Sequence, residues 1–195
     1  MHGSPSDGSR RALRVRPLVL FGLILGAALF RLLPHPPNFT PIGAMALFGG
    51  ALFGSRVAAL GFPLLAMLLS DLLLWWAFGW PLGWMTLVIY ACIALTVLLG
   101  LGMRGRVGFA PVVSRSLLSA LLFFLVTNFA VWVGGGLYSH DWGGLLQCYA
   151  AALPFFGNSL AAYAVFGLAL FGGFALLQRR FPALRSAPRL SKILA

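Results

Sequence analysis

The sequence predicts an all-α integral membrane protein with six transmembrane helices and both termini in the cytoplasm. Two facts of composition support this fold class: 61% of the 195 residues are hydrophobic and only 9% are charged, whereas soluble domains carry about 25% charged residues. The third observation is the pattern, because long apolar stretches alternate with short basic segments along nearly the whole chain. Such alternation is typical of proteins that cross a bilayer several times.

The first two apolar segments differ in how well their lengths match the thickness of a membrane. Residues 1–16 form a basic leader that we expect to be disordered and cytoplasmic, and residues 17–33 are predicted to be a retained first helix, because no convincing signal cleavage site follows them. Residues 41–54 are the weakest candidate. At about 1.5 Å per residue they reach only about 21 Å, against a hydrocarbon core of about 30 Å. On length alone this segment could be re-entrant.

The later segments are long enough to cross. Three continuous apolar runs are predicted to be spanning helices, at residues 57–78, 82–103 and 112–134. The next run, 145–178, exceeds one crossing, and Pro154, Gly157 and Asn158 predict a break within it. We therefore expect a short entry helix and a spanning helix, at residues 145–156 and 158–178. A basic cytoplasmic tail follows, at residues 181–195.

The basic residues decide the number of crossings. With six spans within residues 17–180 and a cytoplasmic amino terminus, thirteen of the fourteen lysines and arginines lie in the cytoplasm, and only Arg31 lies outside. If residues 41–54 did not cross, four would lie inside and ten outside, which opposes the positive-inside bias. The net charge of +11 is thus expected to orient the chain and to contact anionic lipid, not nucleic acid.

Scarce polar residues gather on the outer side in this topology. Asp71 is the only carboxylate within a span, and Arg31 is the only basic residue on the same side, so the two are expected to pair. An ionisable group at this depth costs roughly 2.5–3.5 kcal/mol, so it should face the bundle interior or a wet cavity. The pair either ties two helices together or forms the charged floor of a binding site.

The segment LLPHPPNFTP cannot be helical, because its prolines remove donors and favour extended geometry. It is predicted to be a stiff loop that forms a lid or wall of an outward-facing cavity, with Arg31, His35 and Asn38 as polar members. The alternative is a rigid hairpin that ends the first helix, with Asn38 capping the second.

Aromatic residues follow polar ones at a spacing of four on two helices. Trp75 follows Asp71 and Trp132 follows Asn128, which stacks each pair on one helical face. These tryptophans either anchor the protein at the interface or line a ligand pocket. The predicted ligand-binding residues are Arg31, His35, Asn38, Asp71, Trp75, Tyr90, Asn128, Trp132, His140 and Asn158.

The chain lacks the usual motifs of catalysis. It contains no HExxH, GxSG, P-loop or paired carboxylates, and Ser139, His140 and Asp141 are consecutive, which does not suit a catalytic relay. We predict no enzyme activity, no cofactor and no metal. A metal-dependent membrane enzyme that uses His35 or His140 is a weaker alternative. Cys92 and Cys148 lie in apolar surroundings and are expected to be small buried hydrophobes, not a disulfide framework.

Gly22 and Gly26 form a small-xxx-small pair on the first helix. Such pairs allow another backbone to approach closely, so this face either packs within the molecule or docks a partner subunit.

The phrases RLLPHPPNFTPIGAMALFGGA, FFLVTNFAVWV and YSHDWGGLLQCYAAALPFFGNSL resemble those of a family of uncharacterised small bacterial inner-membrane proteins, over about residues 20–182. This resemblance implies a location in the inner membrane and no particular activity. The chain also has a looser similarity to the S components of energy-coupling factor vitamin transporters, with Gly22 and Gly26 in place of the usual alanine pair. That similarity implies an S-component-like bundle that binds a vitamin or similar solute and docks transporter subunits through helix one. A structural or assembly protein without a ligand is the alternative.

Overall fold

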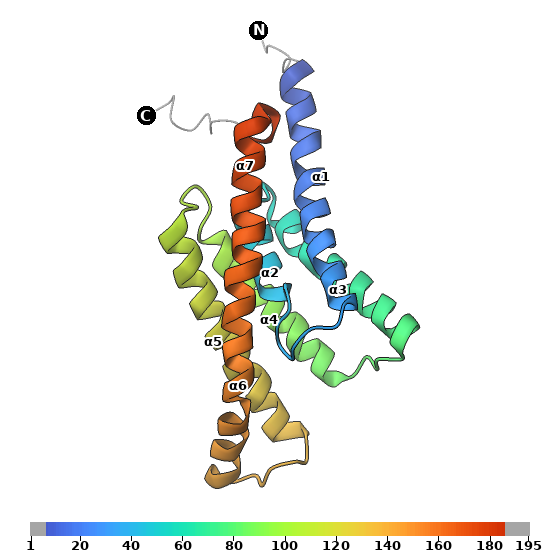
Figure 1. Ribbon diagram of the computed structural model, residues 1–195, viewed down its shortest axis with the longest axis vertical. Helices are drawn as coiled ribbons and strands as arrows, with labels where there is room; N and C mark the ends of the chain where they lie inside the picture. The colour runs from blue at the N-terminus through green and yellow to red at the C-terminus, as the bar shows by residue number, and fades with distance from the viewer. Residues whose placement is uncertain (1–6, 186–195) are drawn as a thin grey trace.

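The computed structural model describes residues 7–185, and in this part of the chain every regular element is a helix (Figure 1). The α-helices are α1 (Asp7–Leu29), α2 (Ile42–Leu52), α3 (Arg56–Phe78), α4 (Trp84–Leu101), α5 (Phe109–Gly134), α6 (Trp142–Gly167) and α7 (Gly173–Arg180). Two short 3₁₀ turns, η1 (Phe30–Leu32) and η3 (Pro182–Leu184), follow α1 and α7, and a π-helical stretch, η2 (Leu168–Gly172), joins α6 to α7. The all-helical prediction is confirmed.

Five helical stretches are long and apolar enough to cross a membrane. They are Val15–Leu32, Arg56–Phe78, Trp84–Leu101, Phe109–Gly134 and Trp142–Arg180. The second of the six predicted spans, residues 41–54, was expected to be short, and here it is the helix α2, which has 11 residues and reaches only roughly 16 Å. Its length is limited because Pro41 is the N-cap residue and the backbone is already extended at Phe53.

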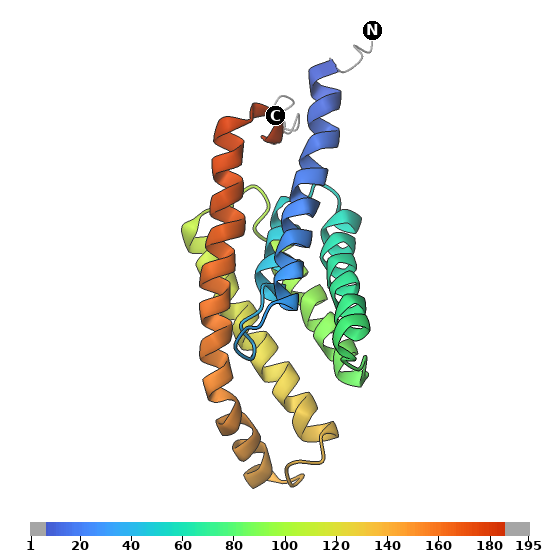
Figure 2. The same cartoon turned by 45° about the vertical axis from the view of Figure 1, so that its right-hand side comes forward.

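The chain nonetheless reverses direction from each helix to the next between α1 and α6, α2 included, and α7 continues in the direction of α6 (Figures 1 and 2). In two views that differ by 45°, α1 and α7 approach the same end of the molecule, where the described chain begins and ends (Figures 1 and 2). A short α2 is enough for this reversal, because it only has to carry the chain from loop 33–41 back to the start of α3. The fold therefore keeps the alternating order expected of six segments, although the second is short.

Two predicted boundaries are wrong. The helix that begins at Trp142 continues through Pro154 without the expected break between residues 156 and 158, and its only irregularity is the π-helical stretch further on. A proline removes one backbone hydrogen bond, and apolar bundle helices tolerate that loss. At the other end of the chain α1 already starts at Asp7, so residues 7–16 are helical where we expected a disordered leader. Residues 1–6 and 186–195 of the predicted leader and tail lie outside the described residues.

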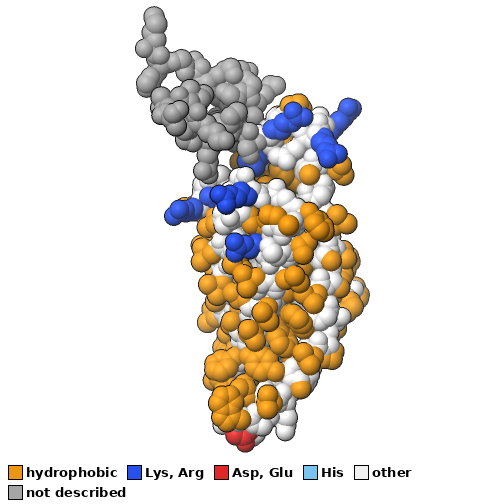
Figure 3. Space-filling model, turned by 90° about the vertical axis from the view of Figure 1, so that its left-hand side faces the viewer, with side chains coloured by type: hydrophobic (Ala, Val, Ile, Leu, Met, Phe, Trp, Pro, Cys, Tyr) orange, Lys and Arg blue, Asp and Glu red, His pale blue; other side chains and the backbone are white. Residues whose placement is uncertain are grey.

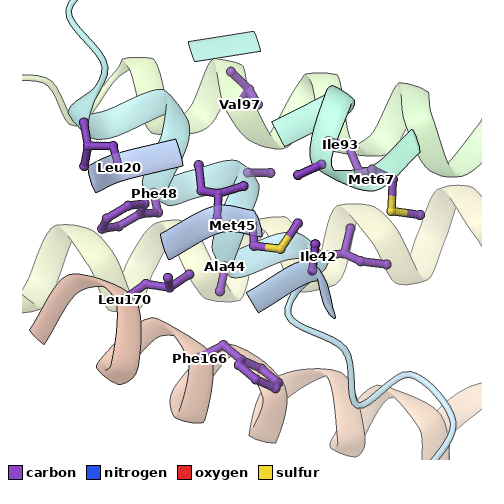
Figure 4. Packing of buried hydrophobic residues seen from close by; sticks show 14 of the residues in the cluster. Leu20, Ile42, Ala44, Met45, Phe48, Met67, Ile93, Val97, Phe166 and Leu170 are labelled. Atoms are coloured by element: carbon purple, nitrogen blue, oxygen red, sulfur yellow. The ribbon is translucent and has the colours of Figure 1, made fainter. Parts of the chain in front are cut away.

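Helix α2 occupies the centre of the bundle. Nine of its residues are buried, and side chains from α1, α3, α4 and α6 converge on it (Figure 4). Glycine permits the closest of these approaches, because a Cβ atom on Gly50 would overlap the carbonyl oxygen of Val97. The backbones of α2 and α4 therefore lie in direct contact, which fixes the position of loop 33–41 at the start of α2.

Arg104, in the turn after α4, caps the end of this central helix. Its Nε donates to the Gly50 carbonyl at 3.1 Å, and its Nη1 and Nη2 donate to the carbonyls of Gly54 and Ser55 at 3.3 and 3.1 Å. Gly50 lies in the last turn of α2, whose carbonyls have no partner within the helix, and Gly54 and Ser55 lie in the exposed turn that follows. The guanidinium therefore ties the end of α2 to this turn.

Helix α1 uses one narrow face for packing. Leu20, Ile24 and Ala28 recur every four residues and are buried, as expected for one stripe of a helix. Gly22 and Gly26 lie elsewhere on the helix, and apart from the neighbouring backbone of α1 itself no heavy atom of the described chain comes within 4 Å of the Cβ position of either. Of the two predicted uses of this pair, internal packing is therefore not seen.

The surface is apolar along most of the molecule's length and charged near its ends. Figure 3 shows hydrophobic side chains over the middle of one face, basic side chains toward the end where α1 begins and α7 ends, and acidic atoms at the opposite tip. Large hydrophobic side chains are exposed on every long helix. A soluble protein rarely exposes apolar surface so extensively, so this distribution fits a multi-pass membrane protein.

Candidate functional site

Loop 33–41 contains a hydrogen-bonded turn. The amide of Phe39 donates to the carbonyl of Pro36 at 3.0 Å, and Asn38 has a φ of 62°. A proline at the second position and an asparagine with positive φ at the third are the signature of a type II turn. Since proline fixes φ and asparagine tolerates the left-handed region, the sequence dictates this shape, and the non-helical loop predicted from LLPHPPNFTP is confirmed for residues 33–41.

Contacts with η1 and α6 hold the loop in place. Asn158 donates from Nδ2 to the Pro37 carbonyl at 2.9 Å. The Phe166 ring packs against Phe30 and Phe39, with centroid separations of 4.9 and 5.6 Å. Asn158, one of the predicted ligand-binding residues, therefore has a positioning role in this structure: it ties the loop to α6.

Arg31 and Asp71 form the predicted ion pair. The Arg31 Nη1 lies 2.6 Å from the Asp71 Oδ1, and the two side chains are only 11% and 8% exposed. The same Nη1 donates to the Ser70 hydroxyl at 2.5 Å, and Tyr90 donates its hydroxyl to the Asp71 Oδ2 at 2.9 Å. The carboxylate is thus enclosed by a cation and a phenol, which offsets the cost of burying it.

A cavity of about 320 Å³ lies between this ion pair and loop 33–41; we call it the loop cavity. Helices α2 to α6 supply most of its wall, which is largely apolar. Its polar members are Arg31, His35, Asn38, Thr40, Cys92, Thr96, Ser159 and Tyr163. Of the predicted ligand-binding residues, the structure therefore brings Arg31, His35 and Asn38 to one cavity, while Asp71 and Tyr90 stand behind Arg31 and do not line it.

A family model matches residues 11–184, which is most of the chain. The protein belongs to the family of unknown function DUF6580. Every residue that lines the loop cavity falls within the DUF6580 match. Searches of curated proteins and of solved structures found no match. The prediction of an uncharacterised family is confirmed, and no comparison supports the looser likeness to S components.

Four predicted residues of this DUF6580 protein lie away from the cavity. Trp75 is 56% exposed on the outside of α3. Asn128 donates to the Phe124 carbonyl of its own helix at 2.7 Å. Trp132 and His140 pack together where α5 turns into α6, with ring centroids 5.6 Å apart. The predicted polar and aromatic pairs on α3 and α5 therefore do not face a common pocket.

The sequence reading missed the hydroxyl groups at the back of the cavity. Thr96 of α4 and Tyr163 of α6 both line it, and the Tyr163 hydroxyl lodges where a side chain at Gly43 would be, because a Cβ there would overlap it. Ser119 of α5 lies beside the same hydroxyl. The signal that could have found these groups is a polar residue in the middle of an apolar helix. This criterion identified Asp71, but it was applied only to acids, amides and Tyr90, so the other hydroxyl groups were missed.

Asp141, the last of the consecutive residues Ser139, His140 and Asp141, is the N-cap residue of α6. The Asp141 carboxylate accepts from the Gly144 amide at 2.7 Å and from the Ser139 hydroxyl at 3.1 Å, and these hydrogen bonds, the backbone one first, lower the pKa of this carboxyl. His140 instead contacts the Trp132 carbonyl at 3.0 Å. The three side chains therefore do not form a relay.

The remaining reactive side chains are the cysteines and the possible metal ligands. Cys92 and Cys148 are both buried free thiols, as predicted. Among residues 7–185 no three histidines, cysteines or acids come close enough to hold a metal ion.

Proposed function

We propose that this protein is a multi-pass protein of the bacterial inner membrane that binds a small solute in the loop cavity and takes part in its transport. The cavity carries this proposal. Its volume of about 320 Å³ lies within the range of about 300–1,000 Å³ that is usual for small-molecule sites. It also combines apolar walls with a few convergent polar groups, as such sites do.

The lining indicates the chemistry of the solute. Arg31 lines the cavity, and its Nη1 makes the ion pair with Asp71 and the contacts with Met67 and Ser70. Asn38, Thr96 and Ser159 add neutral donors and acceptors. Because Asp71 already balances the charge of Arg31, the site does not require an anion. It suits a small, partly apolar solute that carries hydrogen-bond acceptors.

Orientation follows from the positive-inside bias. The basic end of the molecule would face the cytoplasm together with both termini, and the loop cavity would then open toward the periplasm. Partner subunits of a transporter would dock on α1 through Gly22 and Gly26, whose Cβ positions are clear of other atoms. This arrangement would be S-component-like in architecture, and fold-level analogy alone assigns no solute.

A narrowed cavity tests the proposal. Ala120 lines the cavity and is buried, so Ala120→Leu should displace a solute, whereas Ala151→Leu places the same side chain on an exposed part of α6. The protein is purified from native membranes, its helix content is checked by circular dichroism, and bound small molecules are identified by mass spectrometry. We expect one molecule to be retained by the wild type and by Ala151→Leu and lost from Ala120→Leu. No bound molecule in any folded sample would contradict the function.

A structural or assembly protein is the second candidate. The enclosed Asp71 carboxylate favours it, because Arg31 and Tyr90 already satisfy both oxygens. In that case the cavity would hold only solvent, and Ala120→Leu would change neither the bound molecules nor the associated proteins. A metal-dependent enzyme is less well supported, because His35 lines the cavity whereas His140 lies at the α5–α6 turn. Metal analysis of the purified protein tests that alternative.

A further inference from the structure

A second and larger hollow lies between α5 and the continuous helix α6–α7, with a volume of about 610 Å³. We call it the α5–α7 groove. It exists because the two helices pack closely near the middle of α5, where Phe124 meets Tyr149 and Phe156 at centroid separations of 5.5 and 4.9 Å. Toward the opposite ends of α5 and α7 the helices separate (Figure 1), and the π-helical stretch lies along the groove wall.

The lining is that of a site for a hydrocarbon. Almost all of it is apolar, with Val112 and Leu117 on α5 and Ala164, Leu168 and Phe171 opposite. Leu117 and Leu168 are exposed, so the groove opens sideways onto the apolar surface of the protein. An opening of this kind admits a molecule from the lipid phase.

The groove has about the depth of one leaflet. Its lining runs from Phe109 to Leu117 on α5 and from Leu160 to Ala175 on the other wall, which corresponds to about 12 Å and about 22 Å at 1.5 Å per residue. Half of a hydrocarbon core of about 30 Å is about 15 Å. One acyl chain therefore fits the groove along its length.

Arginines stand at the open end. Arg106 directly precedes the lining residue Val107, and Arg179 lies four residues after the lining residue Ala175, hence on the same helical face. Both arginines are exposed. Neither acid among the residues with described side chains can balance them, because Asp71 pairs with Arg31 and Asp141 caps the far end of α6.

We propose that the α5–α7 groove binds an anionic phospholipid, with one acyl chain in the groove and the headgroup phosphate between Arg106 and Arg179. Charge decides between possible occupants. A second copy of this chain in the same orientation would bring its own basic end against these arginines, which repels. A phospholipid supplies both the missing negative charge and the apolar chain. This site is independent of the solute in the loop cavity and requires only that the protein spans a membrane.

The test is native mass spectrometry of the full-length protein in mild detergent, titrated with dioleoyl phosphatidylglycerol or dioleoyl phosphatidylcholine. The two lipids share their acyl chains and differ in headgroup charge. We expect the anionic lipid to bind about tenfold more tightly or better, since each basic residue near a surface favours anionic lipid. Equal binding of the two lipids to the wild type would overturn the proposal.

Matched variants locate the site. The double variant Arg106→Gln with Arg179→Gln should remove the headgroup preference, whereas Arg56→Gln, at an exposed arginine outside the groove lining, should keep it. Ala164→Phe should remove one bound lipid of either headgroup, and Ala161→Phe, which is exposed on α6 outside the groove, should not.

Two results in these variants would overturn the assignment: loss of the preference in Arg56→Gln to the same degree, or an unchanged lipid count in Ala164→Phe. A dimer that vanishes in Ala164→Phe would assign the groove to a second copy instead. Should Ala164→Phe fail to fold, the arginine variants decide the outcome by themselves.

Discussion

Replacing Asp71 with asparagine keeps the shape of the side chain and removes its charge, which leaves Arg31 buried without a counter-ion. The distance of 2.6 Å between Arg31 Nη1 and Asp71 Oδ1, with side chains 11% and 8% exposed, places this pair among buried ion pairs. Removal of one partner of such a pair costs about 3–5 kcal/mol. Tyr90 also loses a charged acceptor, and such hydrogen bonds contribute about 1.5–3 kcal/mol against about 1 for neutral ones.

The double variant isolates the charge effect. Asp71→Asn together with Arg31→Gln removes both charges, so the cost of an unpaired buried ion disappears and we expect a loss of only about 1 kcal/mol relative to the wild type. The coupling energy of the cycle should then be at least about 2 kcal/mol, in the direction in which the second substitution rescues the first.

Unfolding in mixed micelles, followed by circular dichroism, measures each free energy of the cycle. Tyr90→Phe serves as the control, because it removes one hydrogen bond to Asp71 and leaves both charges in place; it should cost about 1.5–3 kcal/mol or less. If the losses of the two single charge variants simply add in the double variant, the pair does not carry the energy assigned to it and the reasoning is wrong.

Four further substitutions test other parts of the fold. Gly50→Ala should destabilise the protein by about 1–3 kcal/mol in thermal unfolding, because a Cβ would overlap the Val97 carbonyl. Asn38→Val should cost about 1–3 kcal/mol at a φ of 62° and expose loop 33–41 to protease, whereas Asn38→Gly should do neither. Arg104→Ala should cost about 1–3 kcal/mol by leaving the buried Gly50 carbonyl in the last turn of α2 without its side-chain donor, and lysine should restore only part of the thermal stability. Because the folded pKa of Asp141 is lowered, its cap stabilises the fold above the unfolded pKa and is lost as the pH falls through the lower folded value; amide exchange at the start of α6 should show this loss, and Asp141→Asn should abolish it.

Composition and hydropathy predicted most of the helices. The bounds of α3 and α4 lie within two residues of those expected, and α5 starts three residues earlier, because a bilayer-length apolar run between basic loops has few other solutions. Hydropathy marked residues 41–54 as short for a span, but it could not say whether they cross, since a short buried helix and a spanning one are equally apolar. Nor could it predict the continuity of α6 through Pro154, which depends on how an apolar helix tolerates a missing hydrogen bond.

The candidate site was predicted only where charge or chain stiffness determines it. Arg31 and Asp71 were paired correctly because each had one available partner, and the proline-rich loop was correct because its residues dictate a turn. Trp75, Asn128 and Trp132 were misplaced because helical spacing does not say which way a face points, and because the tip of the α5–α6 pair extends beyond that of α3–α4 (Figure 2). Thr96 was missed because hydroxyl groups in helices commonly bond to their own backbone and carry little signal.

The brevity of α2 also bears on how the protein is made. A segment of 11 helical residues offers a bilayer too little apolar length to be retained there alone, whereas its neighbours can each insert independently. If the protein inserts into a bilayer, we therefore expect stable entry of α2 to await the synthesis of α3, α4 and α6, whose side chains enclose it. The centre of the bundle would then be among the last parts to reach its place.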